Sequence, residues 1–348
     1  MSGEVFGTQK VRHRQNRLWR RWGLLTGLLV LGIGIILSLG IGSRPVPLQE
    51  TLRAFQAYDP NNDLHLIIRT LRVPRTLVAI LAGAALGVAG AIMQAATRNP
   101  LAEPGLLGIN AGAALAVVLS VAFFNISSMA HYVWFAFAGA GLAGVAVFLL
   151  GQAHETGTNP VRLVLAGAGL SVMLGSIAGI VLLNVPVTVF DNFRTWSAGS
   201  VEGRGSDVVR VLAVSVAIGL AIALSIAGSL NALALGKDLG LALGVSIRTT
   251  WTLSCLCVML LAGAATAAAG PIGFVGLVAP HIARLICGPD YRWILPYSAL
   301  FAAILLLGAD VVGRVIAMPS EVAAGIIASL IGGPFFVLVV RRFRLNKL

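Results

Sequence analysis

The strongest constraint on this chain is an apolar run of helix length between residues 76 and 96. About 20 apolar residues, rising 1.5 Å each along a helix, are enough to cross the hydrocarbon core of a bilayer. Pro74 comes just before the run, where the first turn of a helix tolerates proline. Asn99 follows it as a candidate cap, and Pro100 and Pro104 prevent the helix from continuing. The run therefore predicts a helix that spans a membrane.

Three glycines inside this run predict how the helix packs. Gly83 and Gly87 form a G-x-x-x-G pair, a spacing that lets the backbones of neighbouring helices approach closely, and Gly90 follows one turn later. We therefore expect the helix to lie inside a bundle, rather than to act as a lone anchor.

The composition places the whole chain in the membrane class. Of its 348 residues, 57% are hydrophobic and 11% are charged, whereas ordinary soluble domains carry about 25% charged residues. The chain has 25 Lys and Arg against 13 Asp and Glu, an excess that in a soluble protein would point to nucleic acid. Here most basic residues flank apolar runs, where they act as topology signals. We therefore expect contact with membrane lipid and no nucleic acid partner.

Apolar runs along the chain predict an all-α integral membrane protein with about ten transmembrane helices. We expect a basic cytoplasmic segment at residues 1–22, a single ten-helix transmembrane domain at 23–340, and a basic cytoplasmic tail at 341–348. The expected spans lie at about residues 23–42, 76–96, 106–124, 132–151, 162–183, 208–228, 249–268, 271–286, 293–313 and 321–340. The first span is too long for a signal peptide, and no small-residue cleavage site follows it.

The distribution of basic residues predicts the orientation of these spans. After ten crossings, the basic N-terminal segment and the basic tail lie on the same side of the membrane. Placing both in the cytoplasm puts 16 of the 25 Lys and Arg residues inside and 9 outside, which is the expected bias. We therefore expect a multi-pass protein with both termini in the cytoplasm.

The sequence contains no motif for catalysis, nucleotide binding or metal binding. It has neither a G-x-x-x-x-G-K-[ST] loop for nucleotide phosphates nor a G-x-S-x-G elbow for a nucleophilic serine. None of the five histidines belongs to an H-E-x-x-H motif, and Cys255, Cys257 and Cys287 form no C-x-x-C pair. We therefore expect no catalytic residue, no metal site, no bound cofactor and no enzyme activity in this chain.

Few acidic side chains fall within the expected spans, and this bears on the class of transporter. Asp310 lies near the outer end of the ninth span and Glu103 near the inner surface. Ion-coupled secondary carriers commonly need carboxylates near the middle of the membrane, and selective channels need a filter or a charged ring. Neither feature is visible. A carrier with a carbonyl-based ion site and a channel built as an oligomeric ring stay open as alternatives.

An ordered series of motifs covers nearly the whole chain after Arg69. It comprises LRVPRTLVAILAGAALGVAGAIMQAATRNPLAEPGLLGINAG from 71 to 112, WSAGS from 196 to 200, LGKD from 235 with LG at 243 and 244, GPIGFVGLVAPHIAR from 270 to 284, and GADVVGR from 308 to 314. The series closely resembles the FecCD family, the membrane permeases of bacterial ABC importers for iron-siderophore, haem and cobalamin complexes.

The resemblance implies a type II ABC importer permease fold in the bacterial cytoplasmic (inner) membrane. It implies an iron-siderophore complex as the cargo, with haem or cobalamin as alternatives. It also implies three kinds of partner: a dimer of cytoplasmic ABC ATPase subunits, which would use ATP and Mg; a periplasmic or lipoprotein substrate-binding protein; and a second permease copy, identical or paralogous. The chain itself would be a transport subunit.

Three arginines match the positions at which this family docks its binding protein. These are Arg72 and Arg75 of the R-x-x-R block, and Arg314 after Asp310. Arginine suits bidentate pairing with carboxylates, so the resemblance implies that these residues hold acidic side chains of the partner. The alternative is interfacial snorkelling, in which the charged heads only reach water at the membrane edge.

A glycine-rich stretch from 231 to 245 lies between the sixth and seventh expected spans, and its glycines break it into two short helical pieces. The stretch resembles the family's coupling loop, which inserts into the ATPase subunit. The resemblance implies that the contact residues are Leu235, Gly236, Lys237, Leu243 and Gly244. The alternative is an ordinary cytoplasmic turn.

The turn after residue 97 matches the family's inner gate. Asn99 and Leu101 would narrow the cytoplasmic end of the path together with a second loop that contains Thr158 and Asn159. An Asn-Pro turn can hold a leucine rigidly at a constriction, where an apolar side chain excludes water. The alternative is that Asn99 only caps the helix and Leu101 only anchors the turn.

Overall fold

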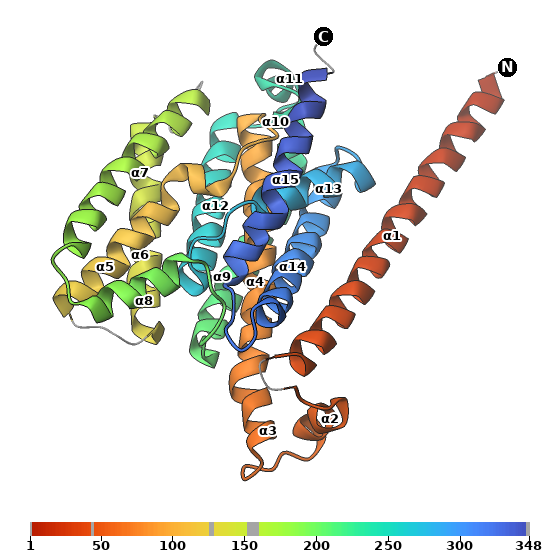
Figure 1. The fold of residues 1–348 in the computed structure, drawn as a ribbon. Helices are drawn as coiled ribbons and strands as arrows, with labels where there is room; N and C mark the ends of the chain where they lie inside the picture. The colour runs from red at the N-terminus through yellow and green to blue at the C-terminus, as the bar shows by residue number, and fades with distance from the viewer. Residues whose placement is uncertain (1, 43–44, 125–128, 152–159, 346–348) are drawn as a thin grey trace.

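The computed structural model describes residues 2–42, 45–124, 129–151 and 160–345, and over these residues the chain is helical without strands (Figure 1). The N-terminal half contains α1 (Ser2–Gly40), α2 (Leu48–Gln56), α3 (Asp63–Leu66), the π-helix η1 (Ile67–Arg72), α4 (Val73–Thr97), the 3₁₀-helix η2 (Pro104–Leu107), α5 (Ile109–Phe124), α6 (Met129–Leu150) and α7 (Pro160–Leu182). The C-terminal half contains α8 (Val187–Ser197), α9 (Ser206–Ser225), α10 (Ala227–Ala234), α11 (Lys237–Ala242), α12 (Ile247–Ala269), α13 (Val275–Cys287), α14 (Tyr291–Ile316) and α15 (Ala324–Leu345).

The ten expected spans appear in order, which confirms the all-α membrane fold. Among the described residues, seven helical segments are long and apolar enough to cross a bilayer: Trp19–Gly40, Asp63–Thr97, His131–Leu150, Val161–Leu182, Ser206–Ser225, Ile247–Ala269 and Tyr291–Ile316. The other three expected spans coincide with shorter apolar helices, Ile109–Phe124, Val275–Cys287 and Ala324–Val339. The helix that contains the first span begins earlier than the span itself, because α1 is helical from Ser2 onward.

Helix α4 is the central helix of the bundle, and its glycines set its contacts. It packs against α9, α12, α13 and α14. A Cβ at Gly83 or Gly87 would collide with the backbone of α14, and a Cβ at Gly90 would collide with the backbone carbonyl of Gly276 in α13. The spacing of these three glycines therefore does what the sequence predicts: it brings helix backbones into close contact.

The helix that contains α4 is longer than expected, because the backbone stays helical from Asp63 to Thr97. Pro74 lies in the first turn of α4 and has no N–H to donate to the preceding turn. The chain accommodates this by widening into η1, where the N–H of Val73 donates to the carbonyl of Ile68, five residues back. Such π-turns inside α-helices are frequent at functional sites.

The C-terminal end of α4 differs from the expected cap. Arg98 adopts the left-handed conformation (φ 51°) and is the C-cap, and its N–H donates to the carbonyl of Ala95. Asn99 instead accepts a hydrogen bond on Oδ1 from the N–H of Leu101, at 3.0 Å. The prediction that Asn99 caps this helix is therefore wrong, because its side chain stabilises the turn that follows.

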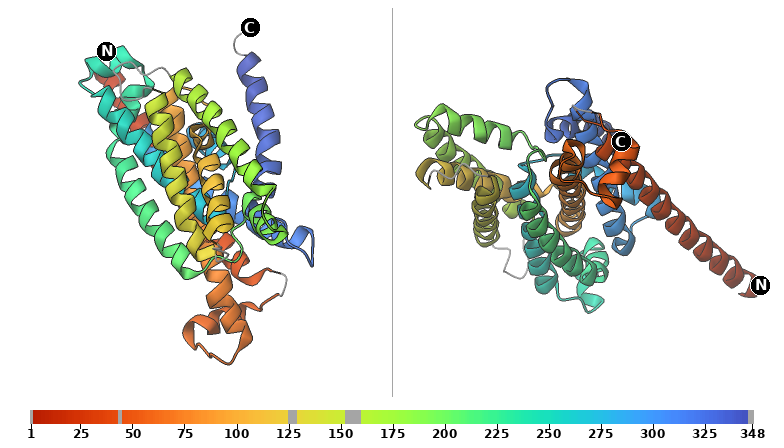
Figure 2. Two further views of the ribbon diagram at one scale, coloured as in Figure 1. Left: turned by 90° about the vertical axis from the view of Figure 1, so that its left-hand side faces the viewer. Right: turned by 90° about the horizontal axis from the view of Figure 1, so that it is seen from below.

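A small outer segment, built from α2, α3 and η1, projects beyond one end of the bundle (Figures 1 and 2). It has its own apolar core of Val46, Ala54 and Ile68, and Arg69 stacks over the ring of Tyr58 at 4.3 Å. We call this end of the molecule the α2–α3 end. The first turn of α1 and the last turn of α15 both lie toward the opposite end, well apart from each other (Figure 1), and an even number of crossings requires the two ends to share one side.

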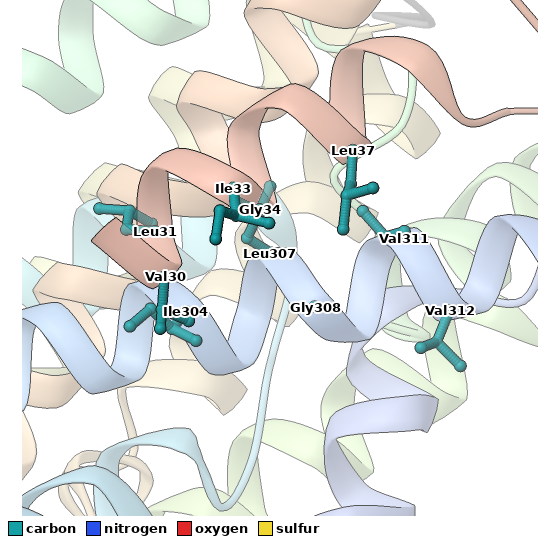
Figure 3. Close-up of a pocket in the computed structure, with 10 residues that line it drawn as sticks. All are labelled: Val30, Leu31, Ile33, Gly34, Leu37, Ile304, Leu307, Gly308, Val311 and Val312. Atoms are coloured by element: carbon teal, nitrogen blue, oxygen red, sulfur yellow. The ribbon is translucent and has the colours of Figure 1, made fainter. Parts of the chain in front are cut away.

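Helix α1 lies on the flank of the bundle and packs along α14. Tyr297 of α14 donates from its hydroxyl to the carbonyl of Arg20 at 2.6 Å, which ties the two helices together. Between them lies a groove of about 300 Å³, lined by apolar side chains of both helices and by one glycine from each, Gly34 and Gly308 (Figure 3). This groove carries no charged or hydroxyl group, so it offers nothing to hold a polar ligand.

Candidate functional sites at the two ends of the bundle

The α2–α3 end contains a buried network of charged residues. Arg75 of α4 donates to both carboxylate oxygens of Asp310 in α14, at distances of 2.8 to 3.2 Å. Arg314, one turn after Asp310 on the same helix, pairs with the same carboxylate. Asp310 is 1% exposed and Arg314 is 2% exposed. One carboxylate thus holds two guanidinium groups from two helices.

Arg314 and Arg72 also fasten the end of α1 to this network. Arg314 donates from Nη1 to the carbonyls of Ser38 and Ile41, at 2.7 and 3.2 Å, and Arg72 donates to the carbonyl of Leu39 at 2.5 Å. The last carbonyls of a helix have no partner within the helix, so cations at this position satisfy them. Both arginines therefore serve the C-terminal end of α1 and are buried.

A cavity of about 280 Å³ lies beside this network. Its walls include all three predicted docking arginines together with two carboxylates that no sequence motif indicated, Glu202 and Glu321. Glu321 accepts a hydrogen bond from Arg75 Nη1 at 2.7 Å. The side chain of Arg75 is 13% exposed and that of Glu321 is 17% exposed, so these two form the part of the network nearest to solvent.

The structure thus brings Arg72, Arg75 and Arg314 together at one cavity, as their assignment to one partner requires. It does not leave all three pointing into solvent, since Arg314 is buried and both of its terminal nitrogens donate to groups within the chain. Snorkelling does not describe Arg314 either, because a snorkelling side chain keeps its charged head in water. The i, i+4 spacing of Asp310 and Arg314 was the available signal for part of this network.

The opposite end of the bundle carries the predicted coupling residues. The stretch forms two short helices, α10 and α11, as expected, and Gly236 (φ 116°) lies between them. Gly244 (φ 77°) follows α11, and both φ values are ones that side chains with a Cβ rarely adopt. Four leucines of this segment are each more than half exposed: Leu235, Leu239, Leu241 and Leu243. Lys237 begins α11.

The turn after α4 lies at the same end as this segment. A Cβ on Gly236 would lie 3.7 Å from Nη1 of Arg98, so the end of α4 is adjacent to the coupling segment. The hydrogen bond from Leu101 to Asn99 holds the turn, and Leu101 is partly exposed. Thr158 and Asn159, the other two predicted gate residues, lie outside the described residues.

Glu103 ties this turn to the loop between α12 and α13. Its Oε1 accepts a hydrogen bond from the N–H of Phe274 at 2.8 Å, and Phe274 has the left-handed φ of 65°. Burial raises the pKa of Glu103 above its ordinary value, and the hydrogen bond from Phe274 offsets part of that rise. Glu103 thus holds a strained residue at the start of α13.

A third hollow, of about 420 Å³, opens between α8, the loop after α12 and the start of α15. Its lining is made of small and apolar residues: Ser197, Ala198, Pro271, Gly325, Ile326, Ser329 and Leu330. Within the residues that the structure describes, no three side chains of His, Cys, Asp or Glu gather as metal ligands would.

Comparison with known sequences decides the family. The model of the FecCD transport family matches residues 29–342. The chain belongs to the FecCD transport family. Among similar proteins, the ferric enterobactin transport system permease protein FepD of Escherichia coli (strain K12) is 44% identical over 316 residues, which cover 90% of this chain and 93% of FepD. The hemin transport system permease protein HmuU of Yersinia pestis is 36% identical over 326 residues, covering 92% of this chain and 96% of HmuU.

A solved structure supports the FecCD assignment at the level of the fold. It is an inward-facing conformation of a metal-chelate type ABC transporter, with a TM-score of 0.79 and 26% sequence identity. The match covers 92% of this chain and 98% of that chain. The predicted ABC permease fold and the predicted family are therefore both confirmed.

Proposed function

We propose that this FecCD permease is the membrane subunit of an ABC importer that carries an iron-siderophore complex across the bacterial cytoplasmic membrane. The observation that carries this proposal is the similarity to FepD, a ferric enterobactin permease, which runs over nearly the full length of both chains. Haem is the second candidate cargo, favoured by the similarity to HmuU.

ATP hydrolysis is assigned to a separate cytoplasmic ATPase dimer, because the chain has no phosphate-binding loop. The exposed leucines around α11 support docking of that partner at Leu235, Gly236, Lys237, Leu243 and Gly244. Large apolar side chains that are exposed together mark protein contacts or lipid contacts. We assign both termini and the coupling segment to the cytoplasm, and we assign the binding of ATP and Mg to the ATPase.

The substrate-binding protein is assigned to the α2–α3 end, at the cavity of Arg72, Arg75 and Arg314. A cavity walled by three guanidinium groups favours acidic side chains, since arginine pairs with carboxylates in a bidentate way. A second permease copy is assigned to complete the path, and the exposed apolar faces of α7 and α15 provide surface for it. The turn of Asn99 and Leu101 is assigned as the inner gate, with Thr158 and Asn159 as its partners by family match.

Reconstituted transport tests the proposal. Proteoliposomes that contain the permease and its ATPase, supplied with the binding protein loaded with ferric siderophore, are expected to accumulate iron only when ATP is present inside. Uptake driven by an ion gradient without the ATPase would identify a carrier instead, and passive uptake would identify a channel. Loading the binding protein with hemin in a parallel experiment separates the two candidate cargoes.

The docking assignment has its own test. The triple variant Arg72→Glu, Arg75→Glu, Arg314→Glu is expected to lose binding-protein association, because like charges across an interface repel. Since Arg72 and Arg314 are both buried, the milder double variant Arg72→Gln, Arg75→Gln serves as the interpretable version if the triple variant does not fold. Normal association of the double variant would show that docking takes place elsewhere.

A further inference from the structure

The two carboxylates on Arg75 are held very differently. Asp310 lies inside α14, is 1% exposed, and is shared by Arg75 and Arg314. In the described part of the chain, Glu321 makes one ion pair, which is the one with Arg75 at 2.7 Å. Asp310 therefore cannot leave without breaking the ion pair of the buried Arg314, whereas Arg75 keeps Asp310 when Glu321 leaves.

The backbone around Glu321 allows this movement. Glu321 lies in the connection between α14, which ends at Ile316, and α15, which begins at Ala324. The connection is anchored next to it, since the N–H of Val322 donates to the carbonyl of Gly313 at 2.9 Å. The Glu321 side chain can therefore turn away by rotation about its own bonds, without opening a helix.

We propose that Glu321 occupies the partner's position on Arg75 when the permease is alone, and that an acidic side chain of the substrate-binding protein displaces it on docking. This inference rests on the proposed docking at Arg72 and Arg75. The incoming carboxylate enters the 280 Å³ cavity, pairs with Nη1 of Arg75, and releases Glu321 to solvent. Asp310 and Arg314 keep their contacts throughout.

Such an exchange makes docking reversible. Without Glu321, the undocked permease would leave one side of the Arg75 guanidinium unpaired, and an acidic partner would bind it without competition. With Glu321, each docking event replaces one carboxylate by another, so the net gain is small and the partner can dissociate after it delivers its cargo. Glu321 thus sets the affinity of the site and is not itself a contact of the partner.

Binding measurements on the complete transporter test the exchange. The permease and ATPase complex is placed in lipid nanodiscs, and the Kd of the substrate-binding protein of the same transport system is measured for the wild type and for Glu321→Gln. The glutamine keeps the size of the side chain and removes its charge. We expect the Kd to fall about fivefold, in proportion to the free energy of a partly exposed ion pair.

Two further variants make the result specific. Glu202 also lies in the wall of this cavity, and among the described residues its carboxylate makes no ion pair with Arg75. Glu202→Gln is therefore expected to change the Kd by less than about twofold. Arg75→Gln is expected to raise the Kd. Adding Glu321→Gln to Arg75→Gln is expected to have no further effect, because the exchange acts only through Arg75.

The outcomes separate this inference from the docking proposal. If Arg75→Gln weakens binding while Glu321→Gln leaves the Kd unchanged or raises it, docking stands and the exchange is wrong. If Glu321→Gln and Glu202→Gln lower the Kd equally, the effect comes from the net charge of the cavity and not from Glu321 itself. That result would also overturn the exchange. If the double variant Arg72→Gln, Arg75→Gln binds normally, the docking site itself is misplaced. Thermal unfolding of each variant confirms that it is folded.

Discussion

Arg75 of α4 and Asp310 of α14 are separated by 235 residues in the sequence and joined by three hydrogen bonds in the structure. The same carboxylate pairs with Arg314, whose Nη1 donates to the carbonyls of Ser38 and Ile41 at the end of α1. This acidic side chain therefore joins α4 to α14 directly and is linked to α1 through Arg314, and the site proposed for docking lies beside it.

Replacing this carboxylate should cost stability. Asp310→Asn removes the negative charge that Arg75 and Arg314 share, so the buried Arg314 loses its ion pair with Asp310 and Arg75 keeps only its pair with Glu321. We therefore expect the free energy of unfolding to fall by about 3 kcal/mol. Thermal unfolding of the purified permease in detergent measures the change. Asp207→Asn is the matched control, because its ion pair with Arg210 is exposed on both sides and should contribute little. Equal melting temperatures for the two variants would show that the network does not stabilise the fold.

Sequence patterns predicted the membrane spans because the bilayer imposes a simple requirement. Each span needs about 20 apolar residues, and that requirement is local in the sequence. The continuous helix from Asp63 was missed because its first ten residues are too polar to count as a span. Helix α2 was also missed, although Leu48, Leu52 and Phe55 have the i, i+4, i+7 spacing of one helical face.

The charged network could be predicted only in part. Family resemblance pointed to Arg72, Arg75 and Arg314, and the i, i+4 spacing of Asp310 and Arg314 indicated one pair. No periodicity links Arg75 to Asp310, or Arg75 to Glu321 in a loop 246 residues later. Such contacts follow from the packing of α4 on α14, which the sequence does not specify residue by residue.

The burial of Glu103 predicts that the stability of the protein depends on pH. Its pKa is raised in the folded protein, so the stabilisation associated with the protonated form is fully present below the unfolded pKa and is lost as the pH rises through the folded pKa. The neutral variant Glu103→Gln keeps an oxygen for the Phe274 N–H. We therefore expect its melting temperature, relative to the wild type, to increase as the pH is raised from 5 to 8, roughly across the titration of a buried carboxyl.

The exposed Asp207→Asn variant is again the control, and its difference from the wild type should show no such trend with pH. A constant difference between Glu103→Gln and the wild type across this range would mean that the charge on Glu103 is not costly in the folded protein.

Gly244 makes a prediction about coupling. Its φ of 77° is strained for any residue with a Cβ, and no neighbouring atom lies within 4 Å of the position that a Cβ would take. Gly244→Val therefore acts through the backbone, at a cost of about 1 to 2 kcal/mol. If the ATPase contacts the backbone in the conformation that Gly244 gives it, stimulation of ATP hydrolysis by the loaded binding protein should fall roughly 5- to 30-fold in this variant.

Gly32→Ala in α1 is the control for Gly244→Val, since it is helical and also has open space around it. It should leave the stimulation unchanged. Full stimulation of Gly244→Val, together with cross-links from the ATPase to the turn at 98–105 and none to residues 235–244, would move the coupling site to that turn.

The turn of Asn99 and Leu101 makes a prediction about leakage. The N–H of Leu101 donates a hydrogen bond to Oδ1 of Asn99 at 3.0 Å, so the leucine is fixed relative to the end of α4. If Leu101 closes the path by excluding water, Leu101→Ser should raise the basal ATP hydrolysis and the passive leak of substrate from proteoliposomes several-fold. Asn99→Ala, which frees the turn but keeps the leucine, should raise both by less.

Binding-protein association is expected to stay at the wild-type level in both variants, because this turn lies at the other end of the bundle from Arg75 (Figure 1). Wild-type leak and wild-type basal hydrolysis in Leu101→Ser, with no disulfide formed between cysteines placed at 101 in two permease copies in any nucleotide state, would exclude the turn as the gate.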